Sequence, residues 1–226
     1  MKRLLLTLIT ASTLLSSPAF AGLLDIQTGA GSFVGSLPMG GAHDIETTKG
    51  ATGWYNANLF ATENVTLTYE YLGFEAGWTN SFTVDGSTAF QNRNYGGTSA
   101  SSVGDSVNSS AAAGALLAFG FEILKGGNAG EGVQNGANNY PIDTFTNKGY
   151  GLPNFFLGYA DAEQNSVYIT LDDGGGRPWT NTSIDDDNHD DLGIIVRATR
   201  IEVPESSTAA LMVFGLAGLM LMRKRT

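Results

Sequence analysis

The stretch NVTLTYEYLGF at residues 64–74 decides the fold class, because its apolar and polar side chains alternate. Successive side chains of an extended chain point to opposite faces. One face therefore carries Val65, Leu67, Tyr69 and Tyr71, and the other carries Thr66, Thr68 and Glu70. Strict alternation of this kind predicts a half-buried β-strand.

Six further stretches are rich in β-branched and aromatic residues and are separated by clusters of Gly, Asn and Asp, which favour tight turns. They lie at residues 54–61, 77–84, 114–124, 154–160, 166–171 and 192–203. Across residues 22–202, apolar residues rarely recur with the period of a helix. We therefore predict one all-β domain over residues 22–202, an antiparallel β-sandwich of jelly-roll type.

Two stretches are polar and rich in glycine, at residues 96–114 and 126–140. We expect both to be long surface loops, the alternative for the first being a linker between two domains. Neither stretch has the strand-to-helix setting or the lysine of a phosphate-binding loop.

The chain has 226 residues, a net charge of −10 and no cysteine. Residues 22–204 alone carry 7 basic and 21 acidic side chains, a net charge of −14. A domain this acidic repels phosphate backbones, which argues against nucleic acid as a partner. Without cysteine it has neither disulfides nor thiolate chemistry.

Residues 1–21 have the three parts of a secretory signal peptide. Lys2 and Arg3 form a basic start, an apolar run follows, and Ala19 and Ala21 provide the small side chains that precede cleavage. We therefore expect export through the inner membrane.

The carboxyl-terminal segment, residues 203–226, contains an apolar run at positions 208–222 that we expect to form a short helix. A bilayer span needs about 20 residues, so this run predicts a marginal, transient membrane anchor. The basic tip that follows would stay on the cytoplasmic side and leave the domain outside.

This segment resembles the PEP-CTERM sorting signal of Gram-negative bacteria. The resemblance rests on seven positions of a turn and a basic tip: Val203, Pro204, Glu205, Ser206, Arg223, Lys224 and Arg225. Ser206 stands where the family usually has proline. The resemblance implies processing by an exosortase-type membrane enzyme and release to the cell envelope, cell surface or extracellular matrix. The alternative is an unprocessed anchor.

An acidic cluster precedes the last predicted strand. Its carboxylates and amides are hard oxygen ligands, and Ca²⁺ takes six to eight of these. The candidate calcium ligands are Asp185, Asp187, Asn188, Asp190 and Asp191, together with Asp173 or Asp172 from the preceding turn. The spacing is not that of an EF-hand. A solvated loop that protects a strand edge is the alternative interpretation.

The same stretch resembles the carboxyl-terminal part of many PEP-CTERM surface proteins and the acidic strands of bacterial extracellular β-sandwich domains. That resemblance implies a structural or ion-binding role. We therefore expect a non-enzymatic surface or matrix protein, associated with exopolysaccharide in a biofilm.

Two alternatives remain. Carbohydrate binding would use an exposed aromatic residue, for which Trp179 is the best candidate, whereas Trp54 and Trp78 lie on strand patterns that favour core packing. A serine hydrolase would use Ser106 and His189, but Ser106 lacks the strand-to-helix context of such a nucleophile.

Overall fold

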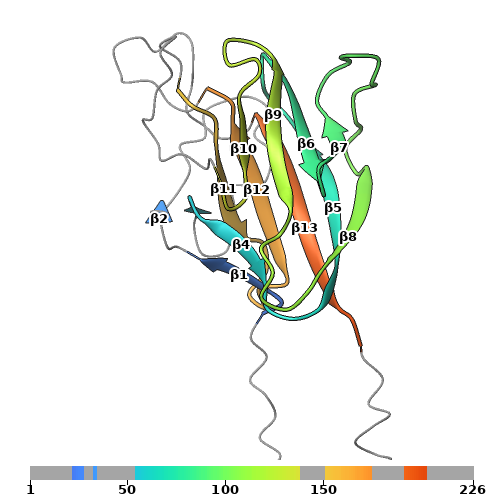
Figure 1. Cartoon of the computed structure of the whole chain (residues 1–226), viewed down its shortest axis with the longest axis vertical. Coiled ribbons are helices and arrows are strands. Elements are labelled where there is room, and N and C mark those ends of the chain that lie inside the picture. The colour runs from blue at the N-terminus through green and yellow to red at the C-terminus, as the bar shows by residue number, and fades with distance from the viewer. Residues whose placement is uncertain (1–21, 28–32, 35–53, 138–150, 175–190, 203–226) are drawn as a thin grey trace, which may run out of the picture.

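The computed structural model describes residues 22–27, 33–34, 54–137, 151–174 and 191–202, and within them the chain is all-β. The strands form antiparallel sheets (Figure 1). This confirms the fold class that the alternation predicts. The predicted signal peptide and the carboxyl-terminal helix lie outside the described residues.

The larger sheet has seven strands in the order β2-β3-β11-β12-β13-β5-β8. Their bounds are β2 Phe33–Val34, β3 Trp54–Tyr55, β11 Asn154–Tyr159, β12 Ser166–Asp172, β13 Leu192–Arg200, β5 Val65–Gly73 and β8 Ser106–Ala111. The alternating stretch at residues 64–74 forms β5, near one edge of this sheet. Its four apolar side chains are at most 1% exposed, as the alternation predicts.

A second sheet has four strands in the order β10-β9-β6-β7, and a third pairs β1 with β4. The bounds are β10 Gly132–Gln134, β9 Phe119–Lys125, β6 Thr79–Val84, β7 Ser87–Gln91, β1 Leu24–Gln27 and β4 Asn58–Ala61. Side chains from all three sheets meet in one hydrophobic core. Phe82 of β6 lies near its centre, 5.6 Å from the Tyr69 ring of β5 and 5.0 Å from the Phe121 ring of β9.

The structure corrects the two loop predictions. Residues 96–114 contain strand β8, and residues 126–140 contain β10. Strand β8, with the sequence SVNSSA, pairs with β5 through its backbone along one edge of the sheet. An edge strand of this kind needs no apolar side chains, so hydrophobic alternation cannot reveal it. The predicted strand at residues 54–61 is also divided, into β3 and β4.

The two ends of the domain meet at the turn between β11 and β12. The backbone amide of Leu23 donates to Asn165 Oδ1 at 3.0 Å, and the amide of Ala198 donates to the Asn165 carbonyl at 2.8 Å. Strands β12 and β13 run from this turn to the opposite end of the sheet, about 20 Å away. We call the end marked by Asn165 the proximal end and the other the distal end; Figure 1 shows the proximal end below.

Candidate functional site

Four segments converge at the distal end. Strand β12 ends at Asp172 and is followed by Asp173, and Asp191 directly precedes β13. The four-stranded sheet, which we call the smaller sheet, contributes Asn80 near the start of β6 and Asn128 in the turn between β9 and β10. We call these five residues the distal cluster.

Asp173 joins the other members of the distal cluster through three hydrogen bonds. Its carboxylate Oδ2 accepts from Asn80 Nδ2 at 2.6 Å, and its carbonyl accepts from Asn128 Nδ2 at 2.8 Å. Its own amide donates to Asp191 Oδ2 at 2.7 Å. Asp173 therefore connects both sheets at the distal end.

Backbone irregularity helps to place Asn80. The pairing of β6 with β9 shifts register between Thr79 and Asn80, and a bulge of this kind re-aims a side chain. Asn92 then fixes the backbone at this position, because its Oδ1 accepts from the Asn80 amide at 2.8 Å. Asn80 is fully buried and its carboxamide faces Asp173.

The electrostatics of the distal cluster are dominated by carboxylates. Desolvation raises the pKa of Asp191 well above its usual range, and the charges of Asp173 and then Asp172 raise it further. The residue keeps some exposed surface, but its carboxyl group is desolvated. Asp172, 1% exposed, accepts from the Gly174 amide at 2.9 Å. Burial and the neighbouring carboxylates therefore disfavour the charged form of the Asp191 carboxyl group.

Two buried amide oxygens of the distal cluster lack a hydrogen-bond partner in the part of the chain that the structure describes. They are Oδ1 of Asn80 and Oδ1 of Asn128, and both residues are 0% exposed. Both Nδ2 groups donate, that of Asn128 to the Gly151 and Asp173 carbonyls. A buried polar atom without a partner costs about 1–3 kcal/mol and calls for an explanation.

The structure brings together two of the sequence-predicted calcium ligands, Asp173 and Asp191. The other four, Asp185, Asp187, Asn188 and Asp190, lie outside the described residues, as do Trp179, His189 and the sorting signal. In the part of the chain that the structure describes, no three His, Cys, Asp or Glu side chains are already arranged to hold a metal ion. The distal cluster supplies carboxylates together with amide oxygens instead.

Sequence reasoning missed Asn80 and Asn128. Neither residue lies near the acidic stretch in sequence. An isolated asparagine at a strand end is typical of a turn and does not indicate a binding site. Only the packing of the smaller sheet against the larger one brings these side chains to Asp173.

Three residues considered for the alternative functions lie among the described residues: Ser106, Trp54 and Trp78. Ser106 is the exposed first residue of edge strand β8, opposite Glu70 of β5. Trp54 is 2% exposed. Trp78 is partly buried, and its indole lies so close to Gly126 that a Cβ there would fall 2.2 Å from the Trp78 Cγ.

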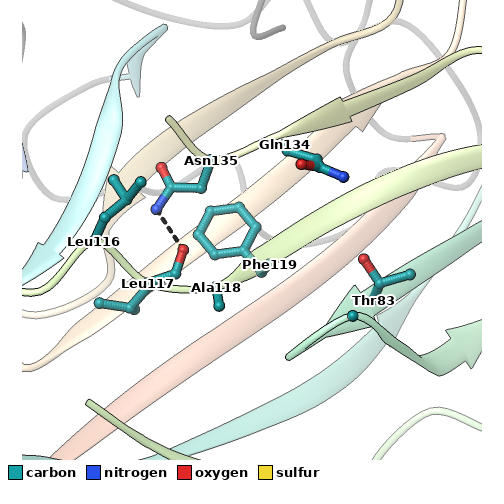
Figure 2. Close-up of a pocket in the computed structure, with 8 residues that line it drawn as sticks. Thr83, Leu116, Leu117, Ala118, Phe119, Gln134 and Asn135 are labelled. Carbon is teal, nitrogen blue, oxygen red and sulfur yellow. Dashed lines mark hydrogen bonds between the residues drawn. The ribbon is translucent and has the colours of Figure 1, made fainter. Parts of the chain in front are cut away.

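Two cavities lie along the smaller sheet. One, of about 290 Å³, lies beside Leu116, Phe119 and Asn135 (Figure 2). Its most buried polar group is occupied, because Asn135 Nδ2 donates to the Leu117 carbonyl at 2.9 Å and to the Leu59 carbonyl at 2.8 Å. The other cavity, of about 430 Å³, follows β9 and β10 past Glu122 and Glu131. We find the stronger case for a site at the distal cluster.

Comparison of the chain with protein-family models, with curated proteins and with solved structures finds no match. Among the described residues there is also no helix of the length and apolarity that crossing a membrane requires.

Proposed function

We propose that the protein is an exported, non-enzymatic β-sandwich of jelly-roll type that is held in the cell envelope or extracellular matrix, in association with exopolysaccharide. The amino-terminal segment directs export, and the PEP-CTERM-like segment directs sorting and processing by an exosortase-type enzyme. The domain is the part that remains to act outside the cell.

One observation carries this proposal: both ends of the domain lie at the Asn165 turn, at the proximal end. Leu23 follows the predicted cleavage position closely, and Ala198 lies just before the sorting segment, yet both bond to Asn165. While the sorting segment is retained in the membrane, the domain is attached through its proximal end and projects its distal end outward. The acidic distal cluster is therefore presented to whatever surrounds the cell.

The composition supports this setting. The chain has no cysteine, and its domain is acidic, which favours solubility and separation from anionic surfaces. Carbohydrate binding through Trp179 stays a prediction, because that residue lies outside the described residues.

Intact mass of the protein recovered from its native host tests the proposal. We expect a product that begins after Ala21 and ends near Pro204 and Glu205. A double variant, Pro204→Ala with Glu205→Ala, should retain the tail, whereas the control Ser207→Ala should be processed normally. A full-length chain in the cytosolic fraction would overturn the proposal.

A further inference from the structure

We propose that the distal cluster is a Ca²⁺ site whose ligands include the amide oxygens of Asn80 and Asn128 beside the carboxylates of Asp173 and Asp191. The inference deepens the proposed function, since an exported domain meets calcium at concentrations that weak extracellular sites require. Such sites have Kd values of about 10⁻⁴ to 10⁻³ M.

Among the described residues, the amide oxygens of Asn80 and Asn128 are buried and have no hydrogen-bond partner. Nδ2 of Asn80 donates to the Asp173 carboxylate, so the Oδ1 on the same carboxamide lies beside the acidic group. Nδ2 of Asn128 donates to the Asp173 carbonyl, so the carboxamide that carries its unpartnered Oδ1 borders the backbone of the same residue. Both oxygens are buried acceptors, and a cation satisfies an acceptor as a hydrogen-bond donor does.

Three acidic residues also meet at this place. Asp191 accepts from the Asp173 amide and Asp172 adjoins Asp173 in the chain, and like charges this close together repel. A cation removes this repulsion, because it attracts every oxygen of the distal cluster.

The donor set selects calcium among the common metals. All five residues offer oxygen and none offers nitrogen as an acceptor or sulfur, which disfavours zinc. Mg²⁺ demands near-ideal octahedral geometry and keeps several waters. Ca²⁺ accepts six to eight oxygens in flexible geometry, which suits carboxylates and amides from four separate segments.

A bound ion would join the two sheets. Asp173 and Asp191 flank strands β12 and β13 of the larger sheet, whereas Asn80 lies in β6 of the four-stranded sheet and Asn128 in that sheet's β9–β10 turn. The chain has no disulfide that could do this. Calcium would therefore stabilise the distal end, which is the end farthest from the predicted point of attachment.

The test uses the full chain, purified in a mild detergent and freed of metal with EGTA. Titration calorimetry with CaCl₂ should show binding, and Mg²⁺ should bind more weakly. Calcium at about 100 times Kd should raise Tm by about 5–10 °C. No calcium binding to this protein would overturn the inference, even if the mass experiment supports export and processing.

Two variants test whether calcium binds at the distal cluster. Asp191→Asn keeps an acceptor for the Asp173 amide and should fold, yet it should weaken calcium binding by about tenfold or more. Glu163→Gln, an exposed change at the proximal end, is the matched control and should bind as the wild type does. Equal binding by Asp191→Asn and wild type would overturn the assignment.

A second comparison separates the distal cluster from the rest of the acidic stretch. A variant with Asp185, Asp186, Asp187 and Asp190 all changed to Asn should still bind calcium and still show the Tm increase. Loss of binding in that variant, with binding retained in Asp191→Asn, would place the ion elsewhere and contradict the proposal.

Discussion

The backbone amide of Asp173 donates to the carboxylate of Asp191 at 2.7 Å, across eighteen residues of sequence. This bond closes the connection between β12 and β13 at the distal end. The same bond holds the Asp191 carboxyl group close to Asp173, so two acidic residues lie side by side.

Asp191 should tolerate asparagine but not alanine in calcium-free buffer. Asn retains an oxygen that accepts from the Asp173 amide, and it removes a charge beside Asp172 and Asp173. We expect the free energy of unfolding of Asp191→Asn to match or exceed that of the wild type. Asp191→Ala leaves the amide unpaired and should lose about 1–3 kcal/mol. Urea unfolding in EGTA measures both, and equal values for the two variants would contradict the role of this bond.

Asn135 should be among the most sensitive polar residues of the described domain. Its Oδ1 accepts from the Leu59 amide at 2.9 Å, and its Nδ2 donates to the Leu59 and Leu117 carbonyls. Asn135→Ala removes the acceptor of the buried Leu59 amide and should cost about 1–3 kcal/mol. The Leu59 and Leu117 carbonyls still accept from the Leu117 and Phe119 amides. Gln134→Ala, at the exposed neighbouring position, should change the free energy of unfolding by about 0.5 kcal/mol or less. Chemical denaturation compares the two, and similar losses would contradict the assignment.

Two buried tyrosines should respond differently to loss of their hydroxyl groups. The Tyr71 hydroxyl is buried without a hydrogen-bond partner, whereas the Tyr159 hydroxyl accepts from the Ile26 amide at 2.9 Å. At neutral pH, Tyr71→Phe should leave the free energy of unfolding unchanged or raise it slightly. Tyr159→Phe should lower it by about 1–3 kcal/mol. Thermal and urea unfolding at pH 7 would contradict this if both variants lost stability equally.

The protein should lose stability at alkaline pH because Tyr71 is buried. Burial raises its pKa to about 12 from the usual 10.0. Between pH 10 and 12 the unfolded chain releases this proton and the folded chain keeps it, so the free energy of unfolding falls as pH rises. This rise in the Tyr71 pKa corresponds to about 2.7 kcal/mol in the free energy of unfolding. Tyr71→Phe should reduce the alkaline loss by up to about that amount, as measured by urea unfolding at pH 10 and 12. An identical pH slope in both proteins would contradict this.

Gly126 should not accept a side chain. Its φ of +144° is rarely adopted by other residues, and a Cβ would fall 2.2 Å from Trp78 Cγ. Gly126→Ala should therefore displace the indole and change tryptophan fluorescence, with a loss of stability of about 2 kcal/mol or more. Gly130→Ala, at φ +92° in open space, is the control and should show the backbone cost without the spectral change. Unchanged fluorescence in Gly126→Ala would be evidence against this packing.

The acidic residues of the candidate site could be predicted from the sequence, but its two asparagines could not. The density of carboxylates before β13 identified Asp173 and Asp191, because hard oxygen ligands are visible in composition. Asn80 and Asn128 could not be predicted, since their role depends on a bulge in β6 and on the β9–β10 turn. Single amides carry no pattern that distinguishes a site from a turn.

The sequence by itself determined that residues 64–74 form a strand and that the domain is all-β, because alternation over a strand is a local property. Only the tertiary structure decided that polar β8 pairs beside β5, and that Asn80 and Asn128 meet Asp173 at the distal end. The physical reason is that strand pairing uses backbone groups common to every residue. Which strands become neighbours is therefore set by packing of the whole core, and the distal cluster is a product of that packing.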